Sequence, residues 1–290
     1  MGSQTVTKQK EQTVTQVMSG AEAIVKILIE EQIQVAFGYP GGAIMPVYDA
    51  LYDEQDRIQH VLARHEQGAI HAAQGYARAT SKPGVCFATS GPGATNLITG
   101  IADAQIDSTP LVCITGQVPS SLLGSDAFQE TDVIGISMPV TKWNCQITDA
   151  TEIPEALAKA FYIAKSGRPG PVLIDITKNA QFEMFDFNYK KCIGIRSYSP
   201  IPKIDKNKIL DAAKLINAAK KPLIVSGQGV ILANAEKEFK SFVEKSGIPA
   251  AWTILGASAL PTSHELNVGM VGMHGNYGPN ILTNQCDLLI

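Results

Sequence analysis

The chain has 290 residues, of which 45% are hydrophobic and 18% charged, enough to bury the core of one large domain or two. Its formal net charge of −3 at pH 7 gives no electrostatic reason to expect nucleic acid or a membrane surface as a partner. Five cysteines are scattered without a CxxC pair, which is typical of a protein of the reducing cytosol.

The N-terminal residues are polar and lack the apolar run of a signal peptide, so residues 1–17 are predicted to form a disordered tail. No stretch of the sequence reaches the roughly 18 apolar residues that a membrane span needs. We therefore expect a soluble, cytoplasmic protein.

From residue 20 onward, helical and strand patterns alternate, which predicts an α/β domain over residues 18–182 with a parallel sheet covered on both faces. Residues 91–96 and 118–152 are interpreted as loops. Helices are predicted at 20–32, 43–53, 66–80, 97–107 and 153–167. Strands are predicted at 33–40, 58–63, 84–90, 109–117 and 170–177.

Residues 183–205 have no hydrophobic period and are predicted to be a linker between domains. A second α/β unit over residues 206–290 follows, interpreted as a partial, Rossmann-like domain because its last strand has no helix after it. Its helices are predicted at 206–219 and 234–246, and its strands at 222–230, 248–253 and 286–290.

The segment LARHEQGAIHAAQGYARAT, residues 62–80, places Glu66 at or just before the first turn of an apolar helix. An acid is favoured there by the free N–H groups and the helix dipole, so an ordinary helix-terminal role is one interpretation. A zinc site is rejected, because His65 and His71 are six residues apart and lie on different helix faces.

Glycine-rich turns follow several predicted strands, where ligands of open parallel sheets collect. Each turn alone is weak support for a ligand site, and a plain turn remains the alternative. Together with Glu66 they outline a cleft with one acid and many backbone groups. Desolvation in such a cleft favours the protonated carboxyl, which suits a proton donor to a cofactor nitrogen. The turns are YPGGA (39–43), SGPGATN (90–96), GQVP (116–119) and SGQGV (226–230).

Several long motifs resemble, in order, the catalytic subunit of the acetohydroxyacid synthase (acetolactate synthase) family. The resemblance covers roughly residues 18–290. RHEQ and SGPG are shared by many thiamine diphosphate enzymes, whereas GSDAFQETD and GMHG are typical of this branch. The motifs are AFGYPGGAIMPVYDAL, RHEQGAIHAAQGYARAT, TSGPGATNLITGIADA, GQVPSSLLGSDAFQETD, TKWN and SGRPGPVLIDITK.

The resemblance gives Glu66 a specific role. In the family, the matching glutamate hydrogen-bonds N1′ of the cofactor's aminopyrimidine, so that the opposite amino group can deprotonate C2 of the thiazolium ring. The resemblance implies decarboxylation of pyruvate and addition of the two-carbon unit to a second 2-keto acid, either pyruvate or 2-ketobutyrate, in branched-chain amino-acid biosynthesis.

The same resemblance implies a substrate channel. Gly42 and Gln129 are expected to line the reacting centre, and Phe128 to form a wall of the channel. For Phe128 a core position is the alternative, and for Lys178 a solvated strand end. The residues that match inhibitor-binding positions at the channel mouth are Ala43, Pro119, Ala127 and Lys178.

The family also binds FAD without a redox role in the main reaction. Arg168 in SGRPGP matches one of its flavin contacts, and a loop histidine is the alternative for His274. The other implied flavin contacts are Gly227, Gly229, Thr253, Leu255, Gly272, His274 and Gly275.

One departure concerns the metal. The family binds the cofactor's diphosphate through Mg²⁺ at a GDG motif in a third domain, and no GDG occurs in this chain. We therefore expect an inactive N-terminal part of a longer subunit, which would form homodimers or larger oligomers with a regulatory small subunit. Another thiamine-dependent decarboxylase or oxidase, or a non-catalytic nucleotide-binding module, is the alternative.

Overall fold

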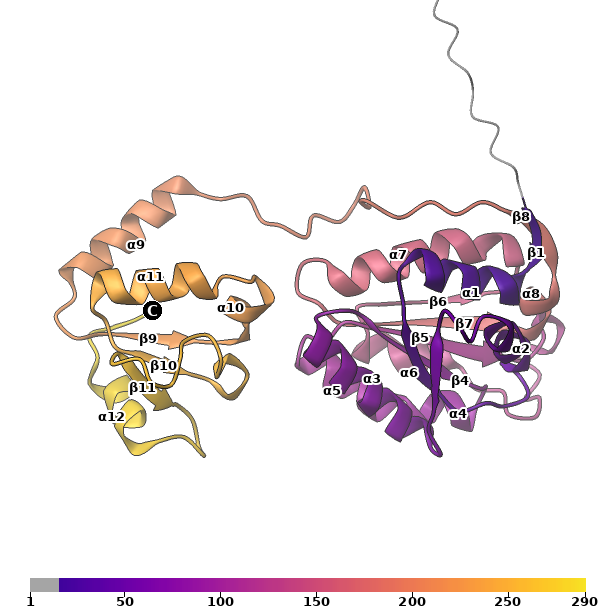
Figure 1. The fold of residues 1–290 in the computed structure, drawn as a ribbon, viewed down its shortest axis with the longest axis horizontal. Helices are drawn as coiled ribbons and strands as arrows, with labels where there is room; N and C mark the ends of the chain where they lie inside the picture. The colour runs from indigo at the N-terminus through magenta and orange to yellow at the C-terminus, as the bar shows by residue number, and fades with distance from the viewer. Residues whose placement is uncertain (1–15) are drawn as a thin grey trace, which may run out of the picture. The chain divides into compact units, whose positions relative to one another are not determined.

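The computed structural model describes residues 16–290, which form two compact units that divide between Pro202 and Lys203 (Figure 1). Of the tail predicted over residues 1–17, residues 1–15 lie outside the described range, and Gln16 begins the first strand. Within residues 16–290, no helix has both the length and the apolar character needed to cross a membrane.

The first unit is built on a six-stranded sheet in which every neighbouring pair of strands is parallel. Its strands are β2 (Val35–Gly38), β3 (Gln59–Leu62), β4 (Gly84–Ala88), β5 (Leu111–Gln117), β6 (Trp143–Ile147) and β7 (Pro171–Thr177). Their order, β3-β2-β4-β5-β7-β6, confirms the predicted parallel sheet. The chain passes from β2 outward to β3 and then to the other side of β2, so the direction of winding changes between β2 and β4.

Both faces of this sheet are buried. Because successive strand residues point to opposite faces, Val112 and Ile114 of β5 pack in one hydrophobic cluster, whereas Leu111 and Cys113 pack in the other. Two-sided burial explains why β4, β5 and β7 are apolar along most of their length instead of alternating with polar residues.

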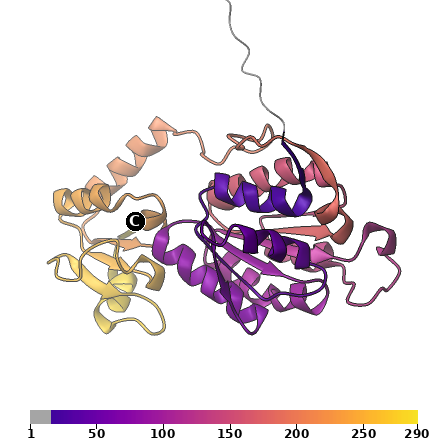
Figure 2. The ribbon, with the colours of Figure 1, turned by 45° about the vertical axis from the view of Figure 1, so that its right-hand side comes forward.

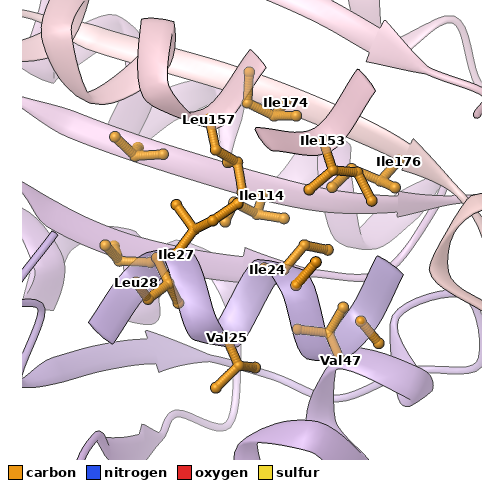
Figure 3. Close-up of a cluster of buried hydrophobic side chains, with 14 of the residues drawn as sticks. Ile24, Val25, Ile27, Leu28, Val47, Ile114, Ile153, Leu157, Ile174 and Ile176 are labelled. Atoms are coloured by element: carbon orange, nitrogen blue, oxygen red, sulfur yellow. The ribbon is translucent and has the colours of Figure 1, made fainter. Parts of the chain in front are cut away.

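Helices cover the two faces in two layers (Figure 2). On one side, Ile24 and Ile27 point toward Ile114 of the sheet, with Leu157 beside them (Figure 3). On that side lie α1 (Gly20–Glu30), α2 (Met45–Asp53), α7 (Ile153–Lys165) and α8 (Lys178–Phe182). On the other lie α3 (Glu66–Thr80), α4 (Pro92–Asn96), α5 (Ile98–Ile106) and α6 (Val133–Ser137).

A separate antiparallel ribbon pairs the first and the last strand of the first unit. β1 (Gln16–Ser19) pairs with β8 (Met184–Phe187), a strand inside the range expected to be linker. Ser19 then caps α1 in a capping box with Glu22, and the backbone N–H of Gly20 donates to the carbonyl of Glu183 at 3.0 Å. The first unit therefore includes residues beyond the last strand of its main sheet.

Two loop predictions in the first unit were wrong. Residues 92–96 form α4, whose Pro92 at the first helical position is a favourable helix start. Residues 118–152 contain α6, β6 and three short 3₁₀ turns, η1 (Ser120–Leu122), η2 (Met138–Val140) and η3 (Ala150–Glu152). The sequence WNCQI of β6 does alternate apolar and polar residues, which is the signal of a half-buried edge strand.

The second unit has a four-stranded parallel sheet of order β11-β10-β9-β12. A small core around Ile224, Val243 and Ala250 holds it together. Its strands are β9 (Pro222–Ser226), β10 (Ala250–Trp252), β11 (Asn267–Met270) and β12 (Leu288–Leu289). Its helices are α9 (Lys206–Ala218), α10 (Gln228–Leu232), α11 (Glu236–Ser246), the 3₁₀ turn η4 (Ile254–Gly256) and α12 (Tyr277–Gln285).

The strand predicted over residues 222–230 is too long. β9 ends at Ser226, and α10 begins two residues later because Gly227 turns the chain and opens a helix. β11 and α12 were not predicted, since the residues of β11 are only partly buried and two of its four positions are glycine or asparagine.

Candidate functional site

The carboxyl end of the first sheet gathers most of the residues singled out in the first unit. Gly42 and Ala43 follow β2, Glu66 follows β3, Pro119 follows β5 and Lys178 follows β7. Because the strands are parallel, these positions lie at one edge of the sheet. The change of winding between β2 and β4 lies among them, which is the place where open parallel sheets bind ligands.

Glu66 is the first residue of α3 and is 7% exposed. His65 caps the helix by accepting from the backbone N–H of Gln67 at 3.1 Å. The carboxyl oxygen Oε2 accepts from Nδ2 of Asn96 at 3.0 Å, and Oε1 accepts no hydrogen bond from residues 16–290. A buried acid therefore keeps one oxygen available for an external donor.

Gly93 leaves room beside this carboxyl. A Cβ at position 93 would lie 3.3 Å from Oε1 of Glu66 and 2.7 Å from Cγ2 of Thr89. A larger residue would thus crowd the acid from the α4 side. Asn96 lies on the same short helix and was not among the predicted site residues. Its amide in the SGPGATN turn was the only sign in the sequence that it could contribute to the site.

The turn after β2 is fixed to β4. Oγ1 of Thr89 accepts from the backbone N–H of Ala43 at 3.2 Å, and a Cβ at Gly41 would lie 2.5 Å from the Thr89 side chain. At Gly42, a Cβ would meet no heavy atom of residues 16–290 within 4 Å. The backbone of Gly42 is therefore open to a ligand beside a rigid support.

The segment after β5 carries Ala127, Phe128 and Gln129. Phe128 is 88% exposed, which excludes the alternative that it belongs to the core. Gln129 has a left-handed backbone with φ of 60°. Gly91, with φ of 55°, approaches it so closely that a Cβ would lie 2.5 Å from the carbonyl oxygen of Gln129. The DAFQE and SGPG turns, far apart in sequence, are therefore in direct contact.

Pro119 and Lys178 belong to neighbouring turns. Pro119 precedes η1, and the backbone N–H of Ser120 donates to Oδ1 of Asn179 at 2.8 Å. Lys178 is the partly buried first residue of α8 and not a freely solvated strand end. The two expected channel-mouth positions thus flank a shared hydrogen bond.

Tyr48 of α2 is a further polar group behind the site that our sequence reading missed. Its hydroxyl is buried and has no hydrogen-bond partner within residues 16–290. Burial, with smaller contributions from Cys86 and Glu66, raises the pKa of Tyr48 well above its usual value. Tyr48 therefore remains neutral at physiological pH.

Arg168 lies away from this group of residues. It precedes β7, and its Nε donates to Oγ of Ser108, which precedes β5, at 2.7 Å. Its Nη2 donates to the carbonyl of Ile106 at 2.7 Å. Arg168 is therefore at the amino end of the first sheet, opposite the edge that holds Glu66.

In the second unit, three turns follow the adjacent strands β9, β10 and β11 at their carboxyl ends. The backbone N–H of Thr253 donates to the carbonyl of Ser226 at 3.0 Å, and a Cβ at Gly227 would lie 3.8 Å from Oγ1 of Thr253. Leu255, in η4, is partly buried beside them. The turns of β9 and β10 are thus in contact.

The third turn contains Gly272, His274 and Gly275. Gly272 has φ of 110°, and Oδ1 of Asn280 accepts from its backbone N–H at 2.9 Å. His274 is exposed, whereas Gly275 is partly buried. At Gly229 and Gly272, a Cβ would meet nothing from residues 16–290 within 4 Å. Glycine turns with this open space at a sheet edge let a ligand approach the backbone closely.

Two family models match the chain. Residues 18–136 match the thiamine pyrophosphate enzyme N-terminal TPP binding domain. Residues 209–290 match the thiamine pyrophosphate enzyme central domain. The first match contains Glu66 and Asn96 with the turns that follow β2, β4 and β5, whereas Lys178 lies outside it. The second match contains the three glycine turns.

Curated relatives are similar over almost the whole chain. An acetolactate synthase large subunit of Corynebacterium glutamicum is 52% identical over 273 residues, which cover 94% of this chain and 44% of the relative. The isozyme 1 large subunit of Escherichia coli is 48% identical, covering 94% of this chain and 48% of the relative. A probable acetolactate synthase large subunit of Methanocaldococcus jannaschii is also 48% identical. The chain spans less than half the length of these relatives.

Proposed function

The chain belongs to the thiamine pyrophosphate enzyme family, and from this premise we propose that it works as the N-terminal and central domains of an acetolactate synthase large subunit. The proposed reaction removes carbon dioxide from pyruvate and joins the remaining two-carbon unit to pyruvate or 2-ketobutyrate. The observation that carries the proposal is the buried carboxyl of Glu66, with one oxygen held by Asn96 and the other available.

Thiamine diphosphate, when bound, supplies the carbanion chemistry of this reaction. The residues present fit its pyrimidine ring: Gly93 leaves space next to Oε1 of Glu66, and Gly42 exposes backbone. Glu66 would hold a proton at Oε1 and share it with a ring nitrogen. Its own position is maintained by the α3 N-terminus and by Asn96.

The substrate is proposed to enter beside the turn that carries Gln129 and Phe128. Gly42 and Gln129 would line the reacting centre, and the exposed ring of Phe128 would exclude water from one side of it. The proposed channel mouth consists of Ala43, Pro119, Ala127 and Lys178.

We also propose FAD as a bound group without a redox step in this reaction. The open turns of the second unit fit a dinucleotide, because a Cβ at Gly229 or Gly272 would meet no heavy atom of residues 16–290 within 4 Å. Arg168 uses Nε and Nη2 within its own unit, and its exposed guanidinium retains donors for a flavin. The flavin contacts proposed besides Arg168 are Gly227, Gly229, Thr253, Leu255, Gly272, His274 and Gly275.

The diphosphate end of the cofactor requires Mg²⁺. We propose that this Mg²⁺ binds outside these 290 residues. No group of three or more His, Cys, Asp or Glu side chains placed to bind a metal occurs within residues 16–290. We propose that the metal site lies in sequence corresponding to the remainder of the relatives. The name "large subunit" of those relatives supports a regulatory small subunit as partner, and a homodimer is the proposed minimum assembly.

Glu66→Gln in the holoenzyme tests the proposal. The amide keeps the shape of the side chain but cannot relay a proton, so turnover should fall by about 10²–10⁴-fold. Exchange of the cofactor's C2 proton for deuterium, followed by NMR after acid quench, should slow in parallel. Glu22→Gln is a matched control, because Glu22 is also an acid in the first turn of a helix. Wild-type C2 exchange in Glu66→Gln would remove Glu66 from this role.

A further inference from the structure

A cluster of buried polar side chains lies in the first sheet beneath the turn that carries Gln129. Asp175 of β7 is fully buried, and Oδ1 accepts from the hydroxyl of Thr115 at 2.7 Å. Its Oδ2 accepts from Nε2 of Gln117 at 3.0 Å and from Nε2 of Gln146 at 2.9 Å. Three neighbouring strands, β5, β7 and β6, thus contribute to one hydrogen-bonded group.

The sheet around this cluster has extensive apolar packing of its own. The strands around it pack through apolar side chains on both faces, and replacing buried charged groups by well-packed apolar ones is often neutral or stabilising. Burial raises the pKa of Asp175, since the hydrogen bonds from Gln146, Thr115 and Gln117 offset only part of the desolvation. Burying the carboxyl of Asp175 therefore costs free energy, and a role other than stabilising the sheet would explain its presence.

Gln117 connects the cluster to the turn above it. The same Nε2 that donates to Asp175 also donates to the carbonyl oxygen of Thr131 at 3.0 Å. Its Oε1 accepts from the backbone N–H of Val118 at 2.9 Å, which fixes the orientation of the amide. Gln117 is 1% exposed, so its bonds to Asp175 and Val118 are shielded from bulk water, and its bond to Thr131 is partly shielded. Thr131 is two residues beyond Gln129.

The turn itself is braced from within. The carboxylate of Glu130 accepts from the backbone N–H groups of Gly124 and of Ala127, the latter at 3.0 Å. These backbone hydrogen bonds lower the pKa of Glu130. Residues 124–130 are therefore a preformed turn that rests on Gly91 at Gln129 and on Gln117 at Thr131.

We propose that Gln117, oriented by Asp175, is a positioning residue that fixes the turn of residues 124–131 and thereby places Gln129 at the reacting centre. The anchoring of the turn stands on the hydrogen bonds alone, whereas its catalytic consequence rests on the proposed function. Gln117 does not touch the substrate. It acts through the backbone of Thr131.

Gln117→Met and Gln146→Met form a matched pair for testing the anchor. Both remove a donor to Oδ2 of Asp175 and put the same apolar side chain in its place, but only Gln117 reaches the turn. Hydrogen–deuterium exchange of peptides covering residues 120–133 should become roughly tenfold faster in Gln117→Met, because the carbonyl of Thr131, a partly buried residue, loses a partner. In Gln146→Met it should stay at the wild-type rate.

Unchanged exchange in Gln117→Met, or an equal increase in both variants, overturns the anchor. If Gln117→Met does not fold, Gln117→Asn replaces it, since an amide one methylene shorter cannot span Asp175 and Thr131 together. We expect the same faster exchange in Gln117→Asn, and unchanged exchange in that variant would overturn the anchor.

Steady-state kinetics of the holoenzyme test the catalytic consequence separately. Misplacement of Gln129 should raise KM for pyruvate several-fold in Gln117→Met, with a smaller change in kcat, whereas Gln146→Met should leave both unchanged. Faster exchange with wild-type kinetics would support the anchor and overturn the place of Gln129 in the proposed function. Wild-type exchange would overturn the anchor whatever the kinetics.

Discussion

At the scale of single residues, this chain buries several titratable side chains, and each is accommodated in a different way. Glu66 has the N-terminus of α3 and one amide of Asn96. Asp175 has three side-chain donors and no helix terminus. The thiols of Cys86 and Cys113 are simply neutral, since burial raises the pKa of the Cys113 thiol to about 12. Of the two buried acids, Glu66 has fewer hydrogen-bond donors than Asp175, and it is the one that remains open to a ligand.

The raised pKa of Asp175 predicts how the stability of the folded chain depends on pH. A carboxyl whose pKa is higher in the folded than in the unfolded chain binds its proton more tightly when folded, so stability falls as pH rises above the usual pKa of 3.8. Asn carries no charge to desolvate, and its amide can still bond Thr115 and the two glutamines. We therefore expect Asp175→Asn to gain stability relative to wild type between pH 4 and pH 7.

Thermal unfolding at several pH values measures this difference. The Tm of Asp175→Asn minus that of the wild type should become more positive as pH increases. Asp53→Asn, a change at an exposed acid of the same unit, should show no such trend. A difference that moves in the opposite direction would mean that the folded chain stabilises the carboxylate of Asp175.

At the scale of elements, Arg168 ties together two turns at the amino edge of the first sheet. Arg168→Ala removes its bonds to Ser108 and Ile106 as well as any contact with a flavin. We expect the holoenzyme to lose most of its FAD and to retain more of its thiamine activation. Flavin absorbance per subunit measures the first, and C2 proton exchange the second.

Ser108→Ala separates the two roles of Arg168. It removes the acceptor of Nε but leaves the guanidinium in place. If the guanidinium itself binds the flavin, Ser108→Ala should keep clearly more FAD than Arg168→Ala. Full FAD occupancy in Arg168→Ala would argue against the assignment, and equal losses in both variants would reduce Arg168 to a support of the turn.

The elements that could be predicted from sequence are those with a long local pattern. The helices α1, α3 and α7 and the buried strands β4, β5 and β7 were predicted within a few residues of their observed ends. β6 and β11 were missed, because edge positions leave them partly polar. The short helix α4 was missed because proline and glycine dominate its sequence.

The same distinction applies to the site. Glu66 could be identified from its place at a helix start, supported by the family motifs. The contact of Asn96 with Glu66 and the pairing of Gln117 with Asp175 could not, because the partners lie 30 and 58 residues apart in sequence. Such contacts depend on which strands become neighbours, and a local pattern does not determine that order.

At the scale of the whole molecule, the first sheet is proposed to hold only the pyrimidine end of thiamine diphosphate. A polypeptide of these 290 residues should show no acetolactate synthase activity and no Mg²⁺-dependent affinity for the cofactor. The metal and backbone contacts of a diphosphate provide much of its binding energy, and the relatives are more than twice as long as the matched region. Only weak contacts between Glu66 and the pyrimidine should remain.

Calorimetric titration of this polypeptide with thiamine diphosphate, with and without Mg²⁺, measures that affinity. A micromolar isotherm that disappears on adding a chelator would require a metal site within these residues. Thiamine itself is a useful comparison, because it has the pyrimidine but no diphosphate and should bind as weakly as the complete cofactor.

The ribbon of β1 and β8 gives the first unit a particular connectivity. Antiparallel pairing of Gln16–Ser19 with Met184–Phe187 places the first and the last strand of this unit side by side. A domain whose first and last strands pair can be circularly permuted, since a short bridge would join those two strands and new ends could open in an exposed turn. The order of the strands along the chain could therefore be changed without changing how the strands are arranged around Glu66.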